Sequence, residues 1–169
     1  GLGMEEDDPG PVLACDPKID GVAISLCYEK GELVRAITRG DGRRGDVVTA
    51  QVRPIRGIPL RLVGEGHPAI LGVRGEIYMP NVVFEALNEQ RSAAGEPAYA
   101  NARNVTAGTL KSLDPTVVAD RGLCFMAHGR GEVEALAGVS GYRAFMDAVR
   151  AWGIPVTVSY THLTLPTNR

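Results

Sequence analysis

Lys18 and its two flanking aspartates form the part of this sequence best suited to chemistry. The segment DPKIDG (residues 16–21) places Asp16 and Asp20 two residues on either side of the lysine, directly before an apolar run. Alternate side chains of an extended backbone share one face, so we expect the three charged groups to point together and Ile19 to turn toward the core.

The amine of an ordinary lysine has a pKa of about 10.4 and must lose its proton before it can attack an electrophile. Desolvation, nearby cations, a bound metal ion or a base can remove that proton, whereas flanking carboxylates alone favour the ammonium form. The aspartates would instead bind substrate hydroxyls and amines or a metal ion. Taken alone, so short a pattern fits a surface strand with an ordinary salt bridge better than a catalytic site.

The composition is that of one globular domain. The chain has 169 residues, of which 44% are hydrophobic and 22% charged, and its formal net charge is −2. It contains no apolar run long enough for a membrane span and no signal peptide, so we expect a cytoplasmic monomer with no membrane contact and no protein partner. Three widely spaced cysteines and three scattered histidines predict no disulfide scaffold and no metal ligands, and we expect His128 to pack at a strand end.

A basic stretch runs from residue 35 to residue 61, where seven arginines face only Asp41 and Asp46. Such a stretch can meet an anion, including a nucleic acid, although basic surface patches are common in proteins that bind neither. Charge alone therefore leaves both interpretations open.

The apolar periodicity predicts an α+β domain with a mainly antiparallel sheet and flanking helices, because strands and helices do not alternate as βαβ units. The run EKGE (residues 29–32) predicts a hairpin. Strands are expected over 22–28, 33–38, 58–63, 69–79 and 123–127. Helices are expected over 47–51 with Asp46 as cap, 81–93, 104–113, and from a Ser140 cap to Gly153. Residues 1–12 are expected to be a disordered lead-in, and 159–169 a tail of uncertain origin.

Further groups of residues follow Lys18 in a fixed order. They are TRGDG at 38–42, DVVTA at 46–50, VRGEIYMP at 73–80, FEALN at 84–88, NARN at 101–104 and AG at 107–108. Together with KIDG at 18–21, this series resembles the adenylation domain of bacterial NAD-dependent DNA ligases. The resemblance extends over about residues 12–156, and we expect residues 13–158 to form part of such a domain.

The resemblance implies a nucleotidyltransferase (ATP-grasp-like) adenylation-domain fold, here truncated, and a covalent mechanism. It implies that Lys18 attacks the α-phosphate of NAD, keeps AMP as a phosphoramidate and releases nicotinamide mononucleotide. AMP would then pass to the 5′-phosphate of nicked double-stranded DNA, and the 3′-hydroxyl would displace it to seal the strand. Mg²⁺ is implied as a cofactor, and zinc only in a downstream part of the family that this chain lacks.

The same resemblance implies roles beside the nucleotide for six further residues. Asp16 matches a position that contacts the adenine edge, with aspartate in place of the usual glutamate. Asp20 matches an acidic position near the nucleotide. Arg39 matches an arginine that approaches the ribose or the phosphate.

Glu76 matches an acidic residue near the adenylate ribose and a metal ion. Without the resemblance, an acid in an apolar strand must find a partner or ligand, unless that strand face is turned to solvent. Arg103 matches a basic residue that faces the phosphates or the DNA. Lys111 takes a position where the family more often has arginine, so the charge is kept and the bidentate fork is lost.

Later parts of the family pattern do not occur in this chain. The resemblance implies two more lysine-bearing motifs that complete the phosphate site, and neither follows residue 156. We therefore expect an internal fragment of a longer ligase that adenylates itself poorly and seals no nick, because electrostatic stabilisation of the transferring phosphoryl group is a large catalytic contribution.

Two other functions stay open. An ATP-dependent ligase or capping-type nucleotidyltransferase shares the KxDG lysine, but the groups at 38–42 and 101–104 favour NAD. A non-catalytic module that binds a nucleotide or a nucleic acid would keep the fold without the reaction, and the incomplete motif set favours it for this molecule.

Overall fold

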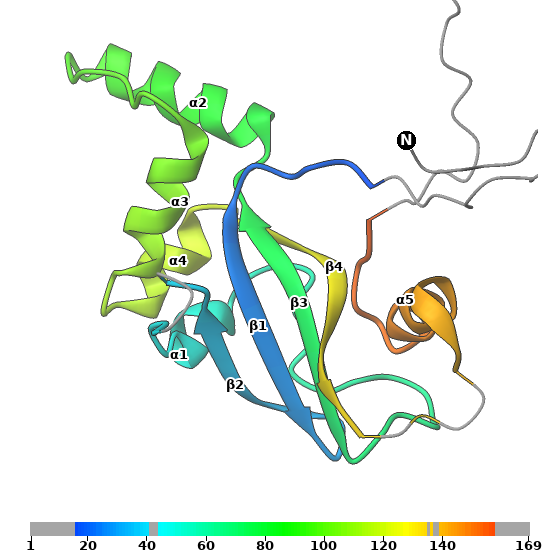
Figure 1. Cartoon of the computed structure of the whole chain (residues 1–169). Coiled ribbons are helices and arrows are strands. Elements are labelled where there is room, and N and C mark those ends of the chain that lie inside the picture. Colours follow the sequence, from blue (N-terminus) through cyan, green and yellow to red (C-terminus); the bar gives the residue numbers. More distant parts are fainter. Residues whose placement is uncertain (1–15, 41–43, 135, 137–138, 158–169) are drawn as a thin grey trace, which may run out of the picture.

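The computed structural model of the chain describes residues 16–40, 44–134, 136 and 139–157 (Figure 1). The predicted lead-in, residues 1–12, and the predicted tail, residues 159–169, lie outside the described residues.

Four antiparallel strands form one sheet in the order β2-β1-β3-β4. The strands are β1 (Val22–Glu29), β2 (Glu32–Thr38), β3 (Ile70–Tyr78) and β4 (Cys124–Val133). The helices are α1 (Thr49–Val52), α2 (Asn81–Ala93), α3 (Ala102–Leu110), α4 (Pro115–Asp120) and α5 (Gly141–Ala151). In Figure 1, α1 to α4 gather to the left of the sheet and α5 lies to its right, beside β4. The predicted α+β class with an antiparallel sheet is confirmed.

The hairpin between β1 and β2 follows directly from its turn residues. Lys30 and Gly31 have φ angles of 50° and 82°, so both central positions are left-handed. Two such residues give the turn whose twist matches that of the paired strands. The hairpin predicted over residues 29–32 is therefore confirmed.

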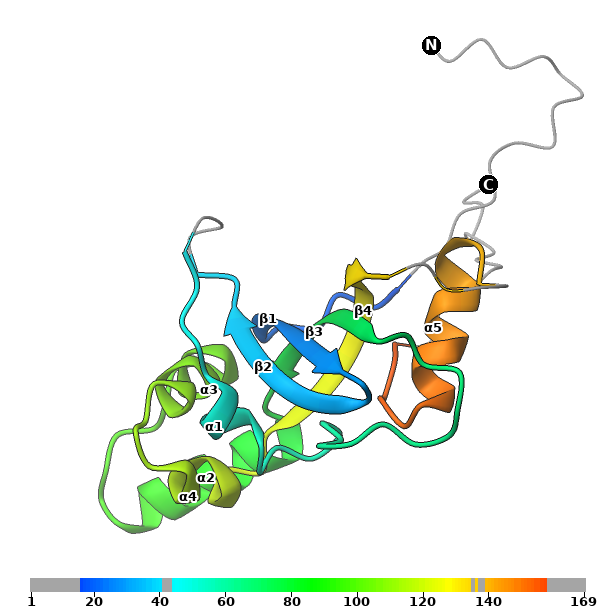
Figure 2. The same cartoon turned by 90° about the horizontal axis from the view of Figure 1, so that it is seen from below.

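The core lies where the two central strands meet the helices. Leu26 on β1 and Val73 and Ile77 on β3 are fully buried. From the other side, α5 buries Phe145 and Val149, and Figure 2 shows this helix beside β4 and opposite α3 and α4. The sheet is thus fixed on both sides, which gives rigid support to residues that project from β3 and β4.

The strand predicted over residues 58–63 is wrong. This segment runs beside the β1–β2 hairpin without becoming a strand, and its pairing is limited to one isolated bridge between Arg61 and Glu32. Pro59 has no N–H to donate to a ladder. Its carbonyl oxygen instead accepts a hydrogen bond of 3.0 Å from the buried Tyr28 hydroxyl, and burial raises the pKa of that phenol.

Two helix predictions need correction, and one helix was not predicted. Helix α1 begins at residue 49 after Val48 and has no side-chain cap, so Asp46 is not its cap. Helix α3 begins two residues early, because the Asn101 side chain accepts a hydrogen bond of 2.8 Å from the backbone N–H of Asn104. Helix α4 was not predicted, because it has only six residues. Asp114 caps its N-terminus, and a proline occupies its first turn.

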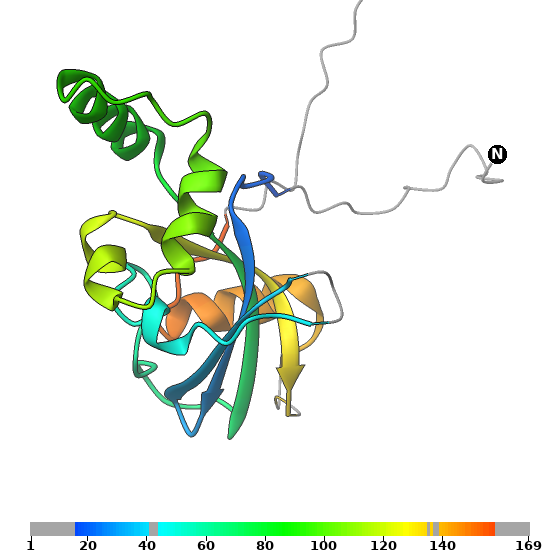
Figure 3. The same cartoon turned by 90° about the vertical axis from the view of Figure 1, so that its left-hand side faces the viewer.

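The remaining boundaries agree with the prediction to different degrees. Helix α2 spans residues 81–93 as expected, and it buries no residue fully, which fits its projection away from the sheet in Figure 3. Strand β4 continues six residues past its predicted end at residue 127. Ser140 stands at the start of α5, but its side chain makes no capping hydrogen bond. None of the helices in the described part of the chain has the length and apolar character needed to cross a membrane.

Candidate active site

Lys18 lies where two cavities meet. The larger, about 630 Å³ in volume, we call the arginine cavity, and the smaller, about 290 Å³, the carboxylate cavity. The charged residues of the arginine cavity are Lys18, Arg39, Asp46, Glu76, Arg103 and Lys111. The polar residues of the carboxylate cavity are Asp16, Lys18, Glu76, His128 and Thr157. Lys18, Ile19 and Glu76 line both.

The segment that carries Lys18 is held against β3 at the glycine that follows it. A Cβ added to Gly21 would lie 2.3 Å from the carbonyl oxygen of Ile77, so only glycine allows this approach. Residues 16–20 form no strand. Asp16 and Lys18 both line the carboxylate cavity, whereas Asp20 lines neither cavity. Ile19, which was predicted to turn toward the core, is half-buried and lines both cavities.

The cations of the arginine cavity come from two sides. Arg39 follows β2, and its backbone N–H donates a hydrogen bond of 2.9 Å to the Ala23 carbonyl oxygen on β1. Gly40 comes next with a φ of 53°, where an added Cβ would meet the Arg44 backbone. Arg103 lies in the first turn of α3 and Lys111 directly follows that helix. Cations that converge on one hollow can bind an anionic group between them.

Asp20 contacts one of these cations. Its Oδ1 atom lies 3.3 Å from Nη1 of Arg103. The side chains of Asp20 and Arg103 are 76% and 57% exposed, so the ion pair is solvated and weakly restrained. Asp20 therefore touches the arginine cavity through Arg103, without lining it.

The carboxylate cavity is built on the two neighbouring strands β3 and β4. Glu76 pairs in register with Met126, and the pairing shifts just beyond, from Gly75 with Ala127 to Arg74 with Gly129. His128 is therefore the extra residue of an irregularity in β4, a feature that redirects a side chain. The Glu76 Oε1 atom lies 3.7 Å from Nε2 of His128, and the Glu76 side chain is only 18% exposed. Burial raises the pKa of Glu76, while His128, Arg103 and Lys18 act in the opposite direction.

Two hydroxyl groups lie at this cavity, one in its lining and one bonded to a lining residue. Thr157 is buried, and its Oγ1 atom has no hydrogen-bond partner within the described residues. Tyr142 on α5 donates a hydrogen bond to Asp16 Oδ2, and its hydroxyl also lies 3.3 Å from the carbonyl oxygen of His128. One polar group is thus fixed and another is left without a partner at the same cavity.

The structure places all seven predicted site residues in or next to these two cavities. Sequence reasoning missed His128 and Thr157. The prediction that His128 packs at a strand end is wrong, because β4 runs on to residue 133 and His128 lines the carboxylate cavity. Its signal was the alternation from Phe125 through Ala127, which puts His128 on the opposite face from these buried residues.

The described residues contain no group of three or more histidine, cysteine or acidic side chains arranged to hold a metal ion. Mg²⁺ commonly binds through substrate phosphates and one or two carboxylates rather than through a protein cage.

Residues 5–166 of the chain match the protein family described as the NAD-dependent DNA ligase adenylation domain. A DNA ligase of Azotobacter vinelandii is 49% identical over 144 residues, which are 85% of this chain and 18% of that protein. A DNA ligase of Trichlorobacter lovleyi is 49% identical over 143 residues, covering 85% and 21%. A DNA ligase of Pseudomonas putida strain W619 is 44% identical over 157 residues, which are 92% of this chain and 20% of that protein. The chain thus spans about a fifth of the length of these relatives, and it belongs to the NAD-dependent DNA ligase adenylation domain family.

Proposed function

We propose that this chain carries the covalent step of an NAD-dependent DNA ligase, with Lys18 as the residue that accepts AMP. The observation that supports this most is the position of Lys18 at the junction of a cation-lined cavity and a carboxylate-lined cavity. A mononucleotide has the same division, with an anionic phosphate at one end and a base rich in donors and acceptors at the other. With the phosphate in the arginine cavity and the ribose at the junction, the α-phosphorus would lie within reach of the Lys18 amine.

The proposed step is a substitution at phosphorus. The lone pair of Lys18 Nζ attacks the α-phosphate of NAD, and a P–N bond forms while the P–O bond to nicotinamide mononucleotide breaks. The leaving group departs with the electron pair of the broken bond, and the amine proton passes to solvent or a base. The phosphoramidate keeps AMP activated for transfer.

Arg39, Arg103 and Lys111 would hold the phosphates in the arginine cavity, where positive charge stabilises the transferring phosphoryl group. Glu76, which lines both cavities, suits the ribose between them. The base would occupy the carboxylate cavity, where Asp16 accepts a hydrogen bond from the exocyclic amine of adenine. This arrangement fits part of a nucleotidyltransferase (ATP-grasp-like) fold.

In the proposed reaction, AMP then passes from Lys18 to the 5′-phosphate of nicked double-stranded DNA, and the 3′-hydroxyl displaces it. Exposed Arg103 and the basic stretch of residues 35–61 suit contact with a DNA backbone. Mg²⁺ would add charge neutralisation at the phosphates. We expect this chain by itself to react slowly with NAD and to seal no nick, because the motif set that completes the phosphate site is not within it.

An activated adenylate tests the nucleophile without requiring the complete phosphate site. Adenosine 5′-phosphorimidazolide carries AMP on an imidazole leaving group, so attack by a lysine amine gives the same phosphoramidate. The whole chain has only three lysines, Lys18, Lys30 and Lys111. Intact-mass and peptide mapping should show AMP on Lys18 at a rate at least about tenfold above Lys30, which lies in the β1–β2 turn.

Two controls make the result decisive. Lys18→Arg keeps the positive charge and should lose the adduct, while Lys30→Arg should react like the wild type. Equal modification of Lys18 and Lys30 would contradict the proposed function. Labelled NAD with Mg²⁺ provides a separate arm, in which strong Lys18-dependent labelling would show that the chain needs no further motif.

A further inference from the structure

Tyr142 connects α5 with the proposed active site. Its hydroxyl donates to Asp16 Oδ2 across 126 positions of sequence and also lies 3.3 Å from the His128 carbonyl oxygen. Asp16 and His128 line the carboxylate cavity, whereas Tyr142 does not line it. The tyrosine therefore contacts the wall of the cavity from behind.

The backbone that carries Tyr142 is firmly anchored. It lies in the first turn of α5, and the next turn buries Phe145 and Met146, which are 2% and 4% exposed. Further along the helix Val149 is fully buried. A side chain on so well anchored a helix can hold its partner in one orientation, which a solvent-exposed aspartate cannot do by itself.

The need for such support follows from the local backbone. Residues 16–20 form no strand, so no ladder of hydrogen bonds restrains the backbone that carries Asp16. The hydrogen bond from Tyr142 ties this carboxylate to α5. The same hydroxyl lies 3.3 Å from the carbonyl oxygen of His128 on β4, which places the tyrosine between the two elements.

We propose that Tyr142 is a positioning residue that orients the Asp16 carboxylate toward the base and so sets the preference of the site for adenine. This inference rests on the proposed function, because it takes the carboxylate cavity as the base site. A fixed carboxylate accepts a hydrogen bond from the 6-amino group of adenine and repels the 6-carbonyl group of hypoxanthine. Without Tyr142 the carboxylate can turn away, and the two bases become less distinct.

The test compares AMP with inosine 5′-monophosphate, whose base differs at this group. Dissociation constants of both nucleotides for the chain are measured by NMR titration for the wild type and for Tyr142→Phe, which keeps the ring. The wild type should prefer AMP, and Tyr142→Phe should lower that preference about three- to tenfold, the range of one intramolecular hydrogen bond.

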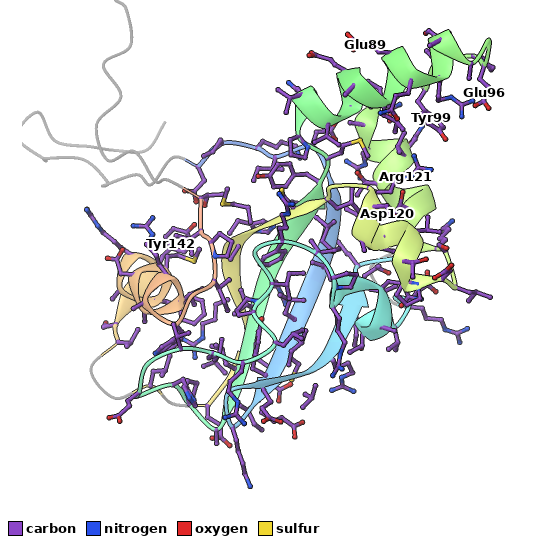
Figure 4. The ribbon with its side chains drawn as sticks, turned by 180° about the vertical axis from the view of Figure 1, so that it is seen from behind. Glu89, Glu96, Tyr99, Asp120, Arg121 and Tyr142 are labelled. Carbon is purple, nitrogen blue, oxygen red and sulfur yellow. The ribbon has the colours of Figure 1, made fainter. Side chains whose placement is uncertain are left out.

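Tyr99→Phe is the matched control. The Tyr99 hydroxyl accepts a hydrogen bond of 3.2 Å from Arg91, and Figure 4 shows this residue near α2, away from Tyr142 on α5. Tyr99→Phe should leave the preference unchanged. A double variant, Asp16→Asn with Tyr142→Phe, should prefer AMP no less than Asp16→Asn alone, because Tyr142 acts only through Asp16.

The outcomes separate the two proposals. If Tyr142→Phe weakens the binding of both nucleotides by the same factor, or changes the binding of neither, the positioning role of Tyr142 is wrong. The assignment of the base site is then unaffected. If the wild type binds both nucleotides equally or binds neither, the assignment of the base to this cavity fails, and the role of Tyr142 fails with it.

Discussion

The arginine cavity and the carboxylate cavity share Lys18 but are built in different ways. The cations of the first stand on the segment after β2 and on both ends of α3, and the Arg103 side chain is 57% exposed. The second lies between the segment before β1 and the adjacent strands β3 and β4, and its Glu76 side chain is 18% exposed. The exposed side chains of the arginine cavity can adjust to a phosphate group that changes during a reaction. The strand residues of the carboxylate cavity present a fixed arrangement to a base that does not change.

This contrast explains why the two sides respond differently to substitution. Exposed cations contribute to ligand binding with little effect on folding, because solvent screens them in the free protein. Half-buried polar groups on β3 and near β4 affect folding directly, because their desolvation is not fully compensated. Variants on the arginine side should therefore change binding, and variants on the carboxylate side should change stability as well.

The largest expected effect is on the arginine side. The double variant Arg39→Ala with Arg103→Ala should lower the preference for AMP over adenosine about tenfold or more, since charge-assisted hydrogen bonds to phosphate are lost. Stability should stay almost constant. Calorimetric or NMR titration with both ligands measures the preference, and Arg121→Ala, at a residue labelled in Figure 4 that lines neither cavity, is the control. An unchanged preference would place the phosphate elsewhere.

On the carboxylate side, Thr157→Val should stabilise the fold by about 1 kcal/mol, because it removes a buried hydroxyl that has no partner among the described residues. Denaturant unfolding gives the free energy, with an unchanged slope expected. A loss of stability would mean that the hydroxyl has a partner in solution. Thr116→Val at an exposed Asp114-bonded threonine is the contrasting variant, which should be destabilising.

Glu76→Gln tests the same side by pH. Burial raises the pKa of Glu76 above its ordinary value of 4.5, so the folded protein binds this proton more tightly than the unfolded chain does. The carboxyl group therefore lowers the stability of the fold as pH rises above that ordinary value. The glutamine variant should therefore gain stability over the wild type from about pH 4 upward and show no advantage below. Denaturation at pH 4 and pH 7 measures the difference. If the variant gained more stability over the wild type at pH 4 than at pH 7, the predicted direction of the pH dependence would be contradicted.

The smallest effect is expected at the ion pair that borders the arginine cavity. Asp20→Asn should change stability by less than about 0.5 kcal/mol, because both partners are more than half exposed. Unfolding at low and high salt checks this. A loss of several kcal/mol would show that the arginine side is as tightly built as the carboxylate side.

Much of the fold was predictable because its signals are local. Alternating apolar residues give β1 to β3, and the left-handed pair Lys30 and Gly31 gives the hairpin. The 58–63 segment has a similar apolar content, but Pro59 and the flanking glycines prevent a ladder. Helix α4 was not predicted because its six residues are too few to show a helical periodicity of apolar residues.

The site divides in the same manner. Lys18 and its motif partners are visible in the sequence, but their arrangement around two cavities is tertiary. It depends on the approach of Gly21 to Ile77 and on the register that sets Glu76 beside Met126. His128 was missed because glycines after it obscure the strand pattern, and Tyr142 because its partner lies 126 positions away.

The most direct measurement is a crystal structure of the chain after reaction with adenosine 5′-phosphorimidazolide. We predict a P–N bond at Lys18, the phosphate toward Arg39 and Arg103, and the adenine between Asp16 and His128. An adduct whose base lies in the arginine cavity, or a modified Lys30 with an unmodified Lys18, would contradict the account.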